Sequence, residues 1–301
     1  MRHLINLLST NTDEFNAILN RGIEHSKNRF LNTTLLKNKV IALLFEKAST
    51  RTRISFSVAI RELGGSDLEL QSSSLQLSRG ETIEDTTQVL ARYVHGVMLR
   101  TYSHRNLELM AGLDQIPIIN GLSDRHHPCQ ALADFLTIMQ TGRDLSKTKI
   151  AFIGDPNNVF NSLALGSLHC GTTVALACPD GYDVRPGIRE LMRKKNRPIQ
   201  VFRDPTEAVK DADVVYTDVW SSMGQEDKAD QRRFDFKNYS ITEELMKRAP
   251  TDAMVMHCLP AHRGEEISGG IMDQYGDMIF QQAENRLHAQ KAVLEWIYGS
   301  I

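Results

Sequence analysis

The chain has 301 residues, which is enough for two α/β domains of common size, and its 41% hydrophobic content is normal for a globular protein. Its 35 Lys and Arg residues against 37 Asp and Glu residues give a formal net charge of −2. This balance argues against a nucleic-acid surface that works by counterion release and against a polybasic membrane anchor. Any anion site must therefore be local.

The cysteines and the first residues indicate a cellular compartment. Cys129, Cys170, Cys178 and Cys258 are widely spaced and form no Cys-x-x-Cys pair, so the sequence predicts neither a disulfide framework nor a zinc ribbon. Residues 1–10 lack a secretory apolar region, and no apolar run approaches the roughly 20 residues that span a bilayer. We expect a cytoplasmic enzyme without a membrane segment.

Short β-branched or aliphatic runs alternate with helical stretches along the whole chain, which predicts parallel sheets flanked by helices. The runs are residues 40–45, 97–100, 116–120, 149–153, 172–177, 199–202, 214–217 and 254–258. A polar stretch at 141–146 predicts a division into two doubly wound domains there. Ligands bind beyond the carboxyl ends of such strands, so loops 46–53, 121–130, 154–162, 218–226 and 258–264 are expected to converge.

The sequence Ser-Thr-Arg-Thr-Arg at 49–53 follows the first strand run and opens a helical pattern. Hydroxyls, guanidinium groups and unsatisfied backbone amides at a helix N-terminus suit a phosphate dianion. The plainer alternative is that Ser49 only caps the helix while Arg51 and Arg53 lie in solvent. Because no P-loop string occurs, we expect the phosphate to belong to a small substrate rather than to ATP.

A second polar group lies in the same half of the chain. Arg100 ends a strand run, and His127, Pro128, Cys129 and Gln130 open the next helix. A guanidinium, an imidazole and a carboxamide can together polarise a carbonyl oxygen and hold an adjacent amide. Taken alone, the histidine is more simply explained as structural.

The turn at 154–158 follows a strand run and at first resembles a dinucleotide-binding turn, but the later glycines are missing. Asparagine side chains that reach a small substrate are therefore favoured over NAD binding. Asp218 also follows a strand run, where its carboxylate can hold an ammonium group. The following Ser222 and Met223 belong either to a loop that closes over a ligand or to an ordinary turn.

Cys258 lies at the end of the last strand run, where its thiol has three possible roles: nucleophile, ligand or packing. Its spacing from His257 and His262 matches no zinc pattern, so no metal site is predicted. A nucleophilic role is equally unsupported, because the thiol can instead orient an amine beside Asp218.

These motifs, with His-Cys-Leu-Pro at 257–260 and Glu-Asn-Arg at 284–286, occur in the order that is typical of ornithine carbamoyltransferases, and the resemblance covers nearly the whole chain. The resemblance to this family implies an α/β fold with two doubly wound parallel-sheet domains joined by interdomain helices. Residues 1–142 would bind carbamoyl phosphate, with a C-terminal helix at about 285–301 packing back onto them, and residues 143–284 would bind ornithine. It also implies no cofactor and a homotrimer with shared active sites.

The resemblance assigns roles residue by residue. The carbamoyl phosphate site would contain Ser49, Thr50, Arg51, Thr52, Gln76, Arg100, His127, Gln130, Cys258, Leu259 and Arg286, with Gln76 lent to the neighbouring subunit. The ornithine site would contain Asn158, Asp218, Ser222, Met223 and Cys258. The residues implied in catalysis are Arg51, Arg100, His127, Gln130, Asp218, Cys258 and Arg286.

The implied reaction is attack of the neutral δ-amine of L-ornithine on carbamoyl phosphate, giving L-citrulline and phosphate in arginine metabolism. As a family, aspartate carbamoyltransferases lack two features that are present here, the Ser-Met-Gly sequence at 222–224 and the cysteine at position 258. A relative that uses putrescine or an N-acylated ornithine, a dinucleotide-binding oxidoreductase and a non-catalytic phosphometabolite sensor stay open as alternatives. One departure is Ser78, where the family often has glycine.

Overall fold

The computed structural model describes residues 1–71, 80–221, 228–299 and 301, and its contacts divide the chain into two compact units. Unit 1 contains Met1–Leu136 and Asn285–Ile301, and unit 2 contains Thr137–Glu284. The chain passes between them inside two helices, α5 (Pro128–Gln140) and α12 (Gly276–Tyr298). Two helices therefore connect the units, as predicted.

Unit 1 is built on a parallel sheet whose order, within the described residues, is β2-β1-β3-β4. The strands are β1 (Val40–Phe45), β2 (Ser66–Gln71), β3 (Gly96–Arg100) and β4 (Ile118–Leu122). Unit 1 contains the first part of α5 and the last part of α12. Its other helices are η1 (Leu7–Ser9), α1 (Thr12–Lys27), α2 (Thr50–Glu62), α3 (Ile83–Tyr93) and α4 (His104–Gly112).

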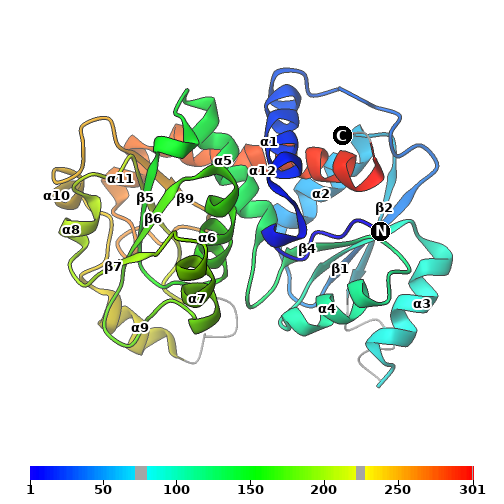
Figure 1. Ribbon diagram of the computed structural model, residues 1–301, viewed down its shortest axis with the longest axis horizontal. Helices are drawn as coiled ribbons and strands as arrows, with labels where there is room; N and C mark the ends of the chain where they lie inside the picture. The colour runs from blue at the N-terminus through cyan, green and yellow to red at the C-terminus, as the bar shows by residue number, and fades with distance from the viewer. Residues whose placement is uncertain (72–79, 222–227, 300) are drawn as a thin grey trace. The chain divides into compact units, whose positions relative to one another are not determined.

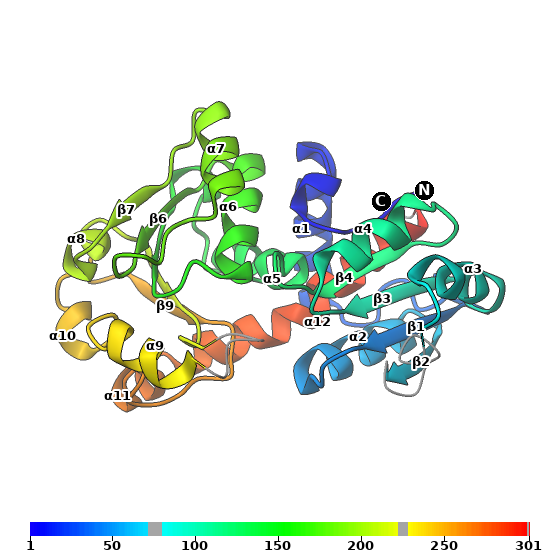
Figure 2. The ribbon, with the colours of Figure 1, turned by 90° about the horizontal axis from the view of Figure 1, so that it is seen from below.

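The central strands of unit 1, β1 and β3, are mostly apolar on both faces, as a sheet covered on both sides requires. Ala42 and Leu44 of β1 pack in one cluster with Leu90 of α3 and Leu107 of α4. The alternate residues of β1 are also buried, and Figure 2 shows α2 on the opposite side of the sheet from α3 and α4. The sheet is thus the middle layer of three.

Unit 2 has the same construction, with a parallel sheet in the order β7-β6-β5-β8-β9 among the residues described. Its strands are β5 (Lys149–Ile153), β6 (Thr173–Ala177), β7 (Gln200–Phe202), β8 (Val214–Thr217) and β9 (Met254–His257). Its remaining helices are η4 (Leu145–Lys147), α6 (Asn158–Cys170), α7 (Pro186–Lys194), α8 (Pro205–Val209), α9 (Ala229–Phe236), α10 (Glu243–Met246) and α11 (Gly269–Gln274).

The two faces of this second sheet are covered by different helices (Figure 1). Ile153 and Val215 face a cluster that includes Phe236 of α9 and Ile271 of α11. Phe152, the neighbour of Ile153 in β5, instead packs edge-on against Phe160 of α6, with ring centroids 5.3 Å apart. Successive side chains of β5 therefore point to opposite faces of the sheet and pack in two different cores.

Both sheets are doubly wound, because each has a point where the strand order reverses. In unit 1 the reversal lies between β1 and β3, and in unit 2 it lies between β5 and β8. Ligands of open α/β sheets bind beyond the carboxyl ends of the strands at such points. The residues that follow Phe45, Arg100, Ile153 and Thr217 therefore lie where such sheets bind their ligands.

The predicted fold class is confirmed, with small differences in the strands. The run at 116–120 is a strand at Ile118–Leu122, and Cys258 lies just after β9 rather than in it. The sequence did not indicate β2, because its polar pattern and its place at the sheet edge leave its side chains half-buried or exposed. Among the described helices, none combines the length and apolar character needed to cross a bilayer.

Candidate functional site

The strand reversal in unit 1 is followed by the N-terminus of α2. Ser49 is its N-cap, and its Oγ accepts the backbone N–H of Thr52 over 3.3 Å. Thr50 and Arg51 are exposed, whereas Thr52 is buried. Ser49 thus caps the helix, as the plainer alternative supposed. Arg51 and Arg53 are both exposed, but the charge of Arg51 acts on Arg100. The guanidinium of Arg53 pairs with Glu69 of β2, with Nη1 and Oε1 3.5 Å apart.

Glu46 ties the ends of β1 and β3 together, a role that the sequence did not reveal. Its backbone N–H donates to the Arg100 carbonyl over 2.9 Å. Its carboxylate accepts from Thr101 Oγ1 at 2.7 Å, from the N–H of Tyr102 at 2.9 Å and from Asn106 Nδ2 at 3.1 Å. These bonds fix the loop that carries Ser49 relative to the strand end that carries Arg100.

Arg286 of α12 joins two of the predicted segments inside unit 1. Its Nη1 donates to Gln130 Oε1 over 2.9 Å, and its Nη2 donates to Thr52 Oγ1 over 3.2 Å. Gln130 Nε2 in turn donates to Asp134 Oδ1 over 2.9 Å, which fixes the orientation of the carboxamide. Asp134 was not predicted, although its place one turn after Gln130 on α5 is a recognisable i,i+4 relation.

The electrostatics of this cluster favour an anion. Burial, followed by the charges of Arg286 and Arg51, lowers the pKa of Arg100 to about 10. Arg100 Nε is buried without a hydrogen-bond partner among the described residues. The charges of Arg51, Arg100 and Arg286 are close enough to disfavour one another, and a phosphate dianion would relieve that repulsion while accepting hydrogen bonds.

His127 is buried beside the same arginines. Burial, and then the charges of Arg286, Arg100 and Arg51, place the pKa of His127 well below its ordinary value. The imidazole is therefore neutral at physiological pH. The adjacent Cys129 is buried, and burial raises the pKa of its thiol to about 12, so this cysteine packs rather than reacts.

In unit 2, the strand reversal brings the β5–α6 turn to the end of β8. Asn157 caps α6 through Oδ1, which accepts the N–H groups of Val159 at 2.9 Å and Phe160 at 3.2 Å. Its Nδ2 donates to Asp218 Oδ2 over 2.6 Å. The predicted Asn158 is the first residue of α6 and is buried. The sequence pointed to Asn158, and the structure adds its neighbour Asn157, which donates the hydrogen bond to Asp218.

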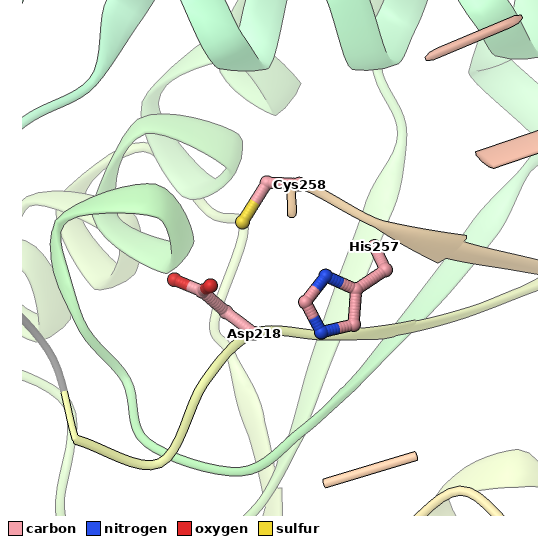
Figure 3. A group of neighbouring side chains, drawn as sticks. All are labelled: Asp218, His257 and Cys258. Atoms are coloured by element: carbon pink, nitrogen blue, oxygen red, sulfur yellow. The ribbon is translucent and has the colours of Figure 1, made fainter. Parts of the chain in front are cut away.

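The Cys258 thiol lies near Asp218. One polar atom from each of Asp218, His257 and Cys258 lies within 4.8 Å of the other two, and Figure 3 shows the thiol of Cys258 directed toward the carboxylate of Asp218. Such a group can in principle hold a metal. However, His257 Nδ1 accepts the N–H of Leu259 at 2.8 Å, and its Nε2 lies 3.1 Å from Glu266 Oε1. Both ring nitrogens are thus engaged, which favours a site for an amine rather than for a metal ion.

Leu259 has φ of +57°, an uncommon backbone conformation for a residue with a side chain, and a cis peptide bond joins it to Pro260. The bond from its N–H to His257 supports this conformation. Three predicted residues, Gln76, Ser222 and Met223, lie outside the described residues.

The two units match two parts of one protein family. Residues 2–140 match the carbamoyl-P binding domain of aspartate/ornithine carbamoyltransferase, and residues 146–297 match the Asp/Orn binding domain. The ornithine carbamoyltransferase of Methanosphaera stadtmanae is 48% identical over 304 residues, covering 99% of both chains.

Solved structures give the same result. The chain is similar to ornithine carbamoyltransferase from Pyrococcus furiosus, with a TM-score of 0.93, 43% identity and coverage of 100% of this chain and 98% of that one. The anabolic ornithine carbamoyltransferase of Campylobacter jejuni has a TM-score of 0.94 and 38% identity, with both chains fully covered. With both units matched and this identity over almost its full length, the chain belongs to the aspartate/ornithine carbamoyltransferase family.

Proposed function

We propose that this chain transfers the carbamoyl group of carbamoyl phosphate to the δ-amine of L-ornithine, giving L-citrulline and phosphate. The observation that carries the choice of ornithine is the pairing of Asp218 with Cys258 at the ends of β8 and β9. The carboxylate can pair with the α-ammonium group of ornithine. The uncharged thiol beside it can lie next to the neutral side-chain amine. The relatives named above are ornithine carbamoyltransferases, which agrees with this choice.

Carbamoyl phosphate would bind in unit 1. Its phosphate would accept hydrogen bonds from the α2 N-terminus and from the side chains of Ser49, Thr50, Arg51 and Thr52. Its carbamoyl group would meet Arg100, His127, Gln130 and Arg286. The bonds of Arg286 to Gln130 and Thr52 support this assignment, because they hold a cation and a carboxamide in fixed orientation before any substrate binds.

Ornithine would bind in unit 2. Asp218 and Asn158 would hold its α-amino and α-carboxylate end, together with Ser222 and Met223, and Cys258 would lie toward the side-chain amine, with Leu259 beside it. The bond from Asn157 to Asp218 supports this role, because it holds one carboxylate oxygen in place. This arrangement would present the substrate by position rather than by covalent bonding to the protein.

The chemistry needs a neutral amine. The nitrogen lone pair attacks the carbamoyl carbon, forming a C–N bond and a tetrahedral oxyanion, and the C–O bond to phosphate then breaks. Phosphate leaves with the electrons of that bond, and the proton released by the amine nitrogen passes to the departing phosphate. The guanidinium groups of Arg51, Arg100 and Arg286 would stabilise the oxyanion and the leaving phosphate, while neutral His127 would contribute a hydrogen bond without adding charge.

We further propose that the active protein is a homotrimer in which Gln76 serves the neighbouring subunit's phosphate site, and that it works in the cytoplasm in arginine metabolism. None of the four cysteines forms a disulfide in the described part of the chain, which agrees with a reducing compartment. Light scattering of the purified protein tests the trimer directly.

The function is tested by incubating the protein with carbamoyl phosphate and, in parallel, L-ornithine, putrescine, N-acetylornithine and L-aspartate. Citrulline formation from ornithine alone is expected, and Arg51→Ala should abolish it. Carbamoylation of a different amine would contradict the assignment of unit 2 but keep that of unit 1. Binding of carbamoyl phosphate without turnover of any amine would replace the enzyme by a phosphometabolite sensor.

A further inference from the structure

Two carboxylates, Asp155 and Asp218, lie at the strand reversal of unit 2, and they have different partners. Asp155, in the turn after β5, forms an ion pair with Arg232 of α9, with Nη2 and Oδ2 2.6 Å apart. Among the residues that the structure describes, the donors to Asp218, after β8, are both neutral: Asn157 Nδ2 at 2.6 Å and the N–H of Val219 at 2.8 Å. In the described part of the chain, no ion pair involves Asp218.

Arg232 is held firmly in this position. Its Nε donates to the carbonyl of Trp220, two residues after Asp218. Its guanidinium lies over two aromatic rings, 5.0 Å from the centroid of Tyr182 and 5.3 Å from that of Phe236. The Arg232 and Asp155 side chains are only 7% and 12% exposed. A buried cation with this many contacts is an invariable part of the local fold rather than a passing surface pair.

We propose that Arg232 is a positioning residue for ornithine, because it neutralises Asp155 and thereby leaves Asp218 as the single carboxylate that receives the substrate's ammonium group. The inference rests on the proposed function, and it adds a residue that does not itself touch the substrate. Its bond to Trp220 gives the same guanidinium a second effect, because it fixes the chain just after Asp218 relative to the turn that carries Asp155 and Asn157.

The physical reason is the proximity of the two acids. The negative charge of Asp218 contributes to raising the pKa of Asp155, although burial is the larger cause and Arg232 opposes both. Without the guanidinium, the two carboxyls would compete for the ammonium group and for the hydrogen bond from Asn157. Ornithine would then lose its fixed orientation even though every residue that contacts it is present.

The test is a double-mutant cycle on the full-length protein with ornithine kinetics as the readout. In Arg232→Gln, we expect kcat/KM for ornithine to fall by at least about tenfold, mostly through KM, while carbamoyl phosphate binding stays unchanged. Asp155→Asn alone should also lower it, because the unbalanced guanidinium would be drawn to Asp218. The double variant D155N/R232Q keeps Asp218 as the single carboxylate of the pair and lacks the guanidinium of Arg232, and it should recover most of the lost kcat/KM.

Recovery in the double variant supports the proposal, because a role in packing alone would make two changes at least as harmful as one. A double variant no better than R232Q, or an R232Q variant with unchanged ornithine KM, would overturn it. Arg232→Lys keeps the charge and should retain more activity than R232Q, and thermal unfolding of each variant identifies any that does not fold. Failure of the proposed function would be distinguishable, because the unmodified protein would then make no citrulline.

Discussion

Arg286 of α12 donates a hydrogen bond from Nη1 to Oε1 of Gln130 over 2.9 Å, so a residue near the C-terminus fixes a side chain in the first turn of α5. The same guanidinium reaches Thr52 in α2. One planar fork thus holds two segments that are more than 70 residues apart in the sequence, and it does so next to the arginines that would bind carbamoyl phosphate.

Replacing this fork should damage the chemical step. Arg286→Lys keeps one positive charge but cannot make both hydrogen bonds in the same geometry. We expect kcat to fall by about 100-fold, with a small change in KM for ornithine, because the oxyanion and the leaving phosphate lose a preorganised donor. Steady-state kinetics with both substrates measures this, and Arg193→Lys, on the exposed face of α7, is the matched control. A loss confined to ornithine KM would contradict the assignment.

Asp218→Asn should separate the two substrates. The substitution removes the charge that would receive the ammonium group and leaves a side chain of the same size, so ornithine KM should rise by about 100-fold. Carbamoyl phosphate affinity, measured by calorimetry, should be unchanged, since the residues proposed to bind its phosphate belong to unit 1 and Asp218 is not among its proposed ligands. Asp230→Asn is the control, because that side chain is 99% exposed. Equal losses for the two substrates would indicate a general folding defect.

The pH dependence should report ornithine rather than His127. The amine of free ornithine has an ordinary pKa of about 10.4, so its neutral fraction, and with it kcat/KM, rises with pH across the neutral range. His127 adds no step near pH 6.5, because its pKa lies well below that value and the imidazole is neutral throughout. A flat profile would exclude amine deprotonation as a governing step, and an added inflection near pH 6.5 that is lost in His127→Gln would show that this histidine titrates.

Glu295 should stabilise unit 1 in a pH-dependent manner. Burial raises its pKa, but hydrogen bonds from His25 and Arg21 outweigh burial and lower the pKa to about 2, from an ordinary value of 4.5. The folded protein therefore binds the proton less readily than the unfolded chain does. The stabilisation, about 2–3 kcal/mol, is complete above pH 4.5 and is lost as pH falls toward 2.

Denaturant unfolding of Glu295→Gln tests this prediction. The variant should be less stable than the unmodified protein at pH 7, and the difference should shrink as the pH is lowered below 4.5. Glu24→Gln is the control, because Glu24 also contacts Arg21 but its side chain is 55% exposed, and such surface pairs contribute little. A difference that is the same at both pH values would assign the effect to packing.

The shared active site predicts complementation between inactive variants. In the proposed trimer, each site combines Arg51 of one subunit with Gln76 of its neighbour. Mixing the Arg51→Ala and Gln76→Ala variants and letting the trimers exchange subunits would therefore create some sites with both native residues. For an equal mixture, about a quarter of the sites should be intact, so activity should return to about that fraction. Each variant incubated alone is the control, and no recovery despite proven exchange of subunits would mean that each chain completes its own site.

The sequence by itself determined the fold class and most of the candidate residues. Apolar strand runs and polar strand ends are local features, so the helix start at Ser49, the strand end at Arg100 and the polar turn before Asn158 could all be found from pattern alone. The polar strand β2 was missed, because an edge strand needs no continuous apolar run. Arg286 entered only through resemblance to a family, since no local pattern distinguishes it from other helix arginines.

Only the tertiary structure decided which of these polar groups work together. Glu46 with Thr101, Gln130 with Arg286, and Asp155 with Arg232 are pairs whose members are distant in the sequence and are brought together by the packing of strands and helices. Their charges and hydrogen bonds also depend on burial, which sequence distance does not encode. For that reason only the folded structure shows that His127 is neutral and that Asp155 pairs with an arginine while Asp218 accepts a hydrogen bond from Asn157.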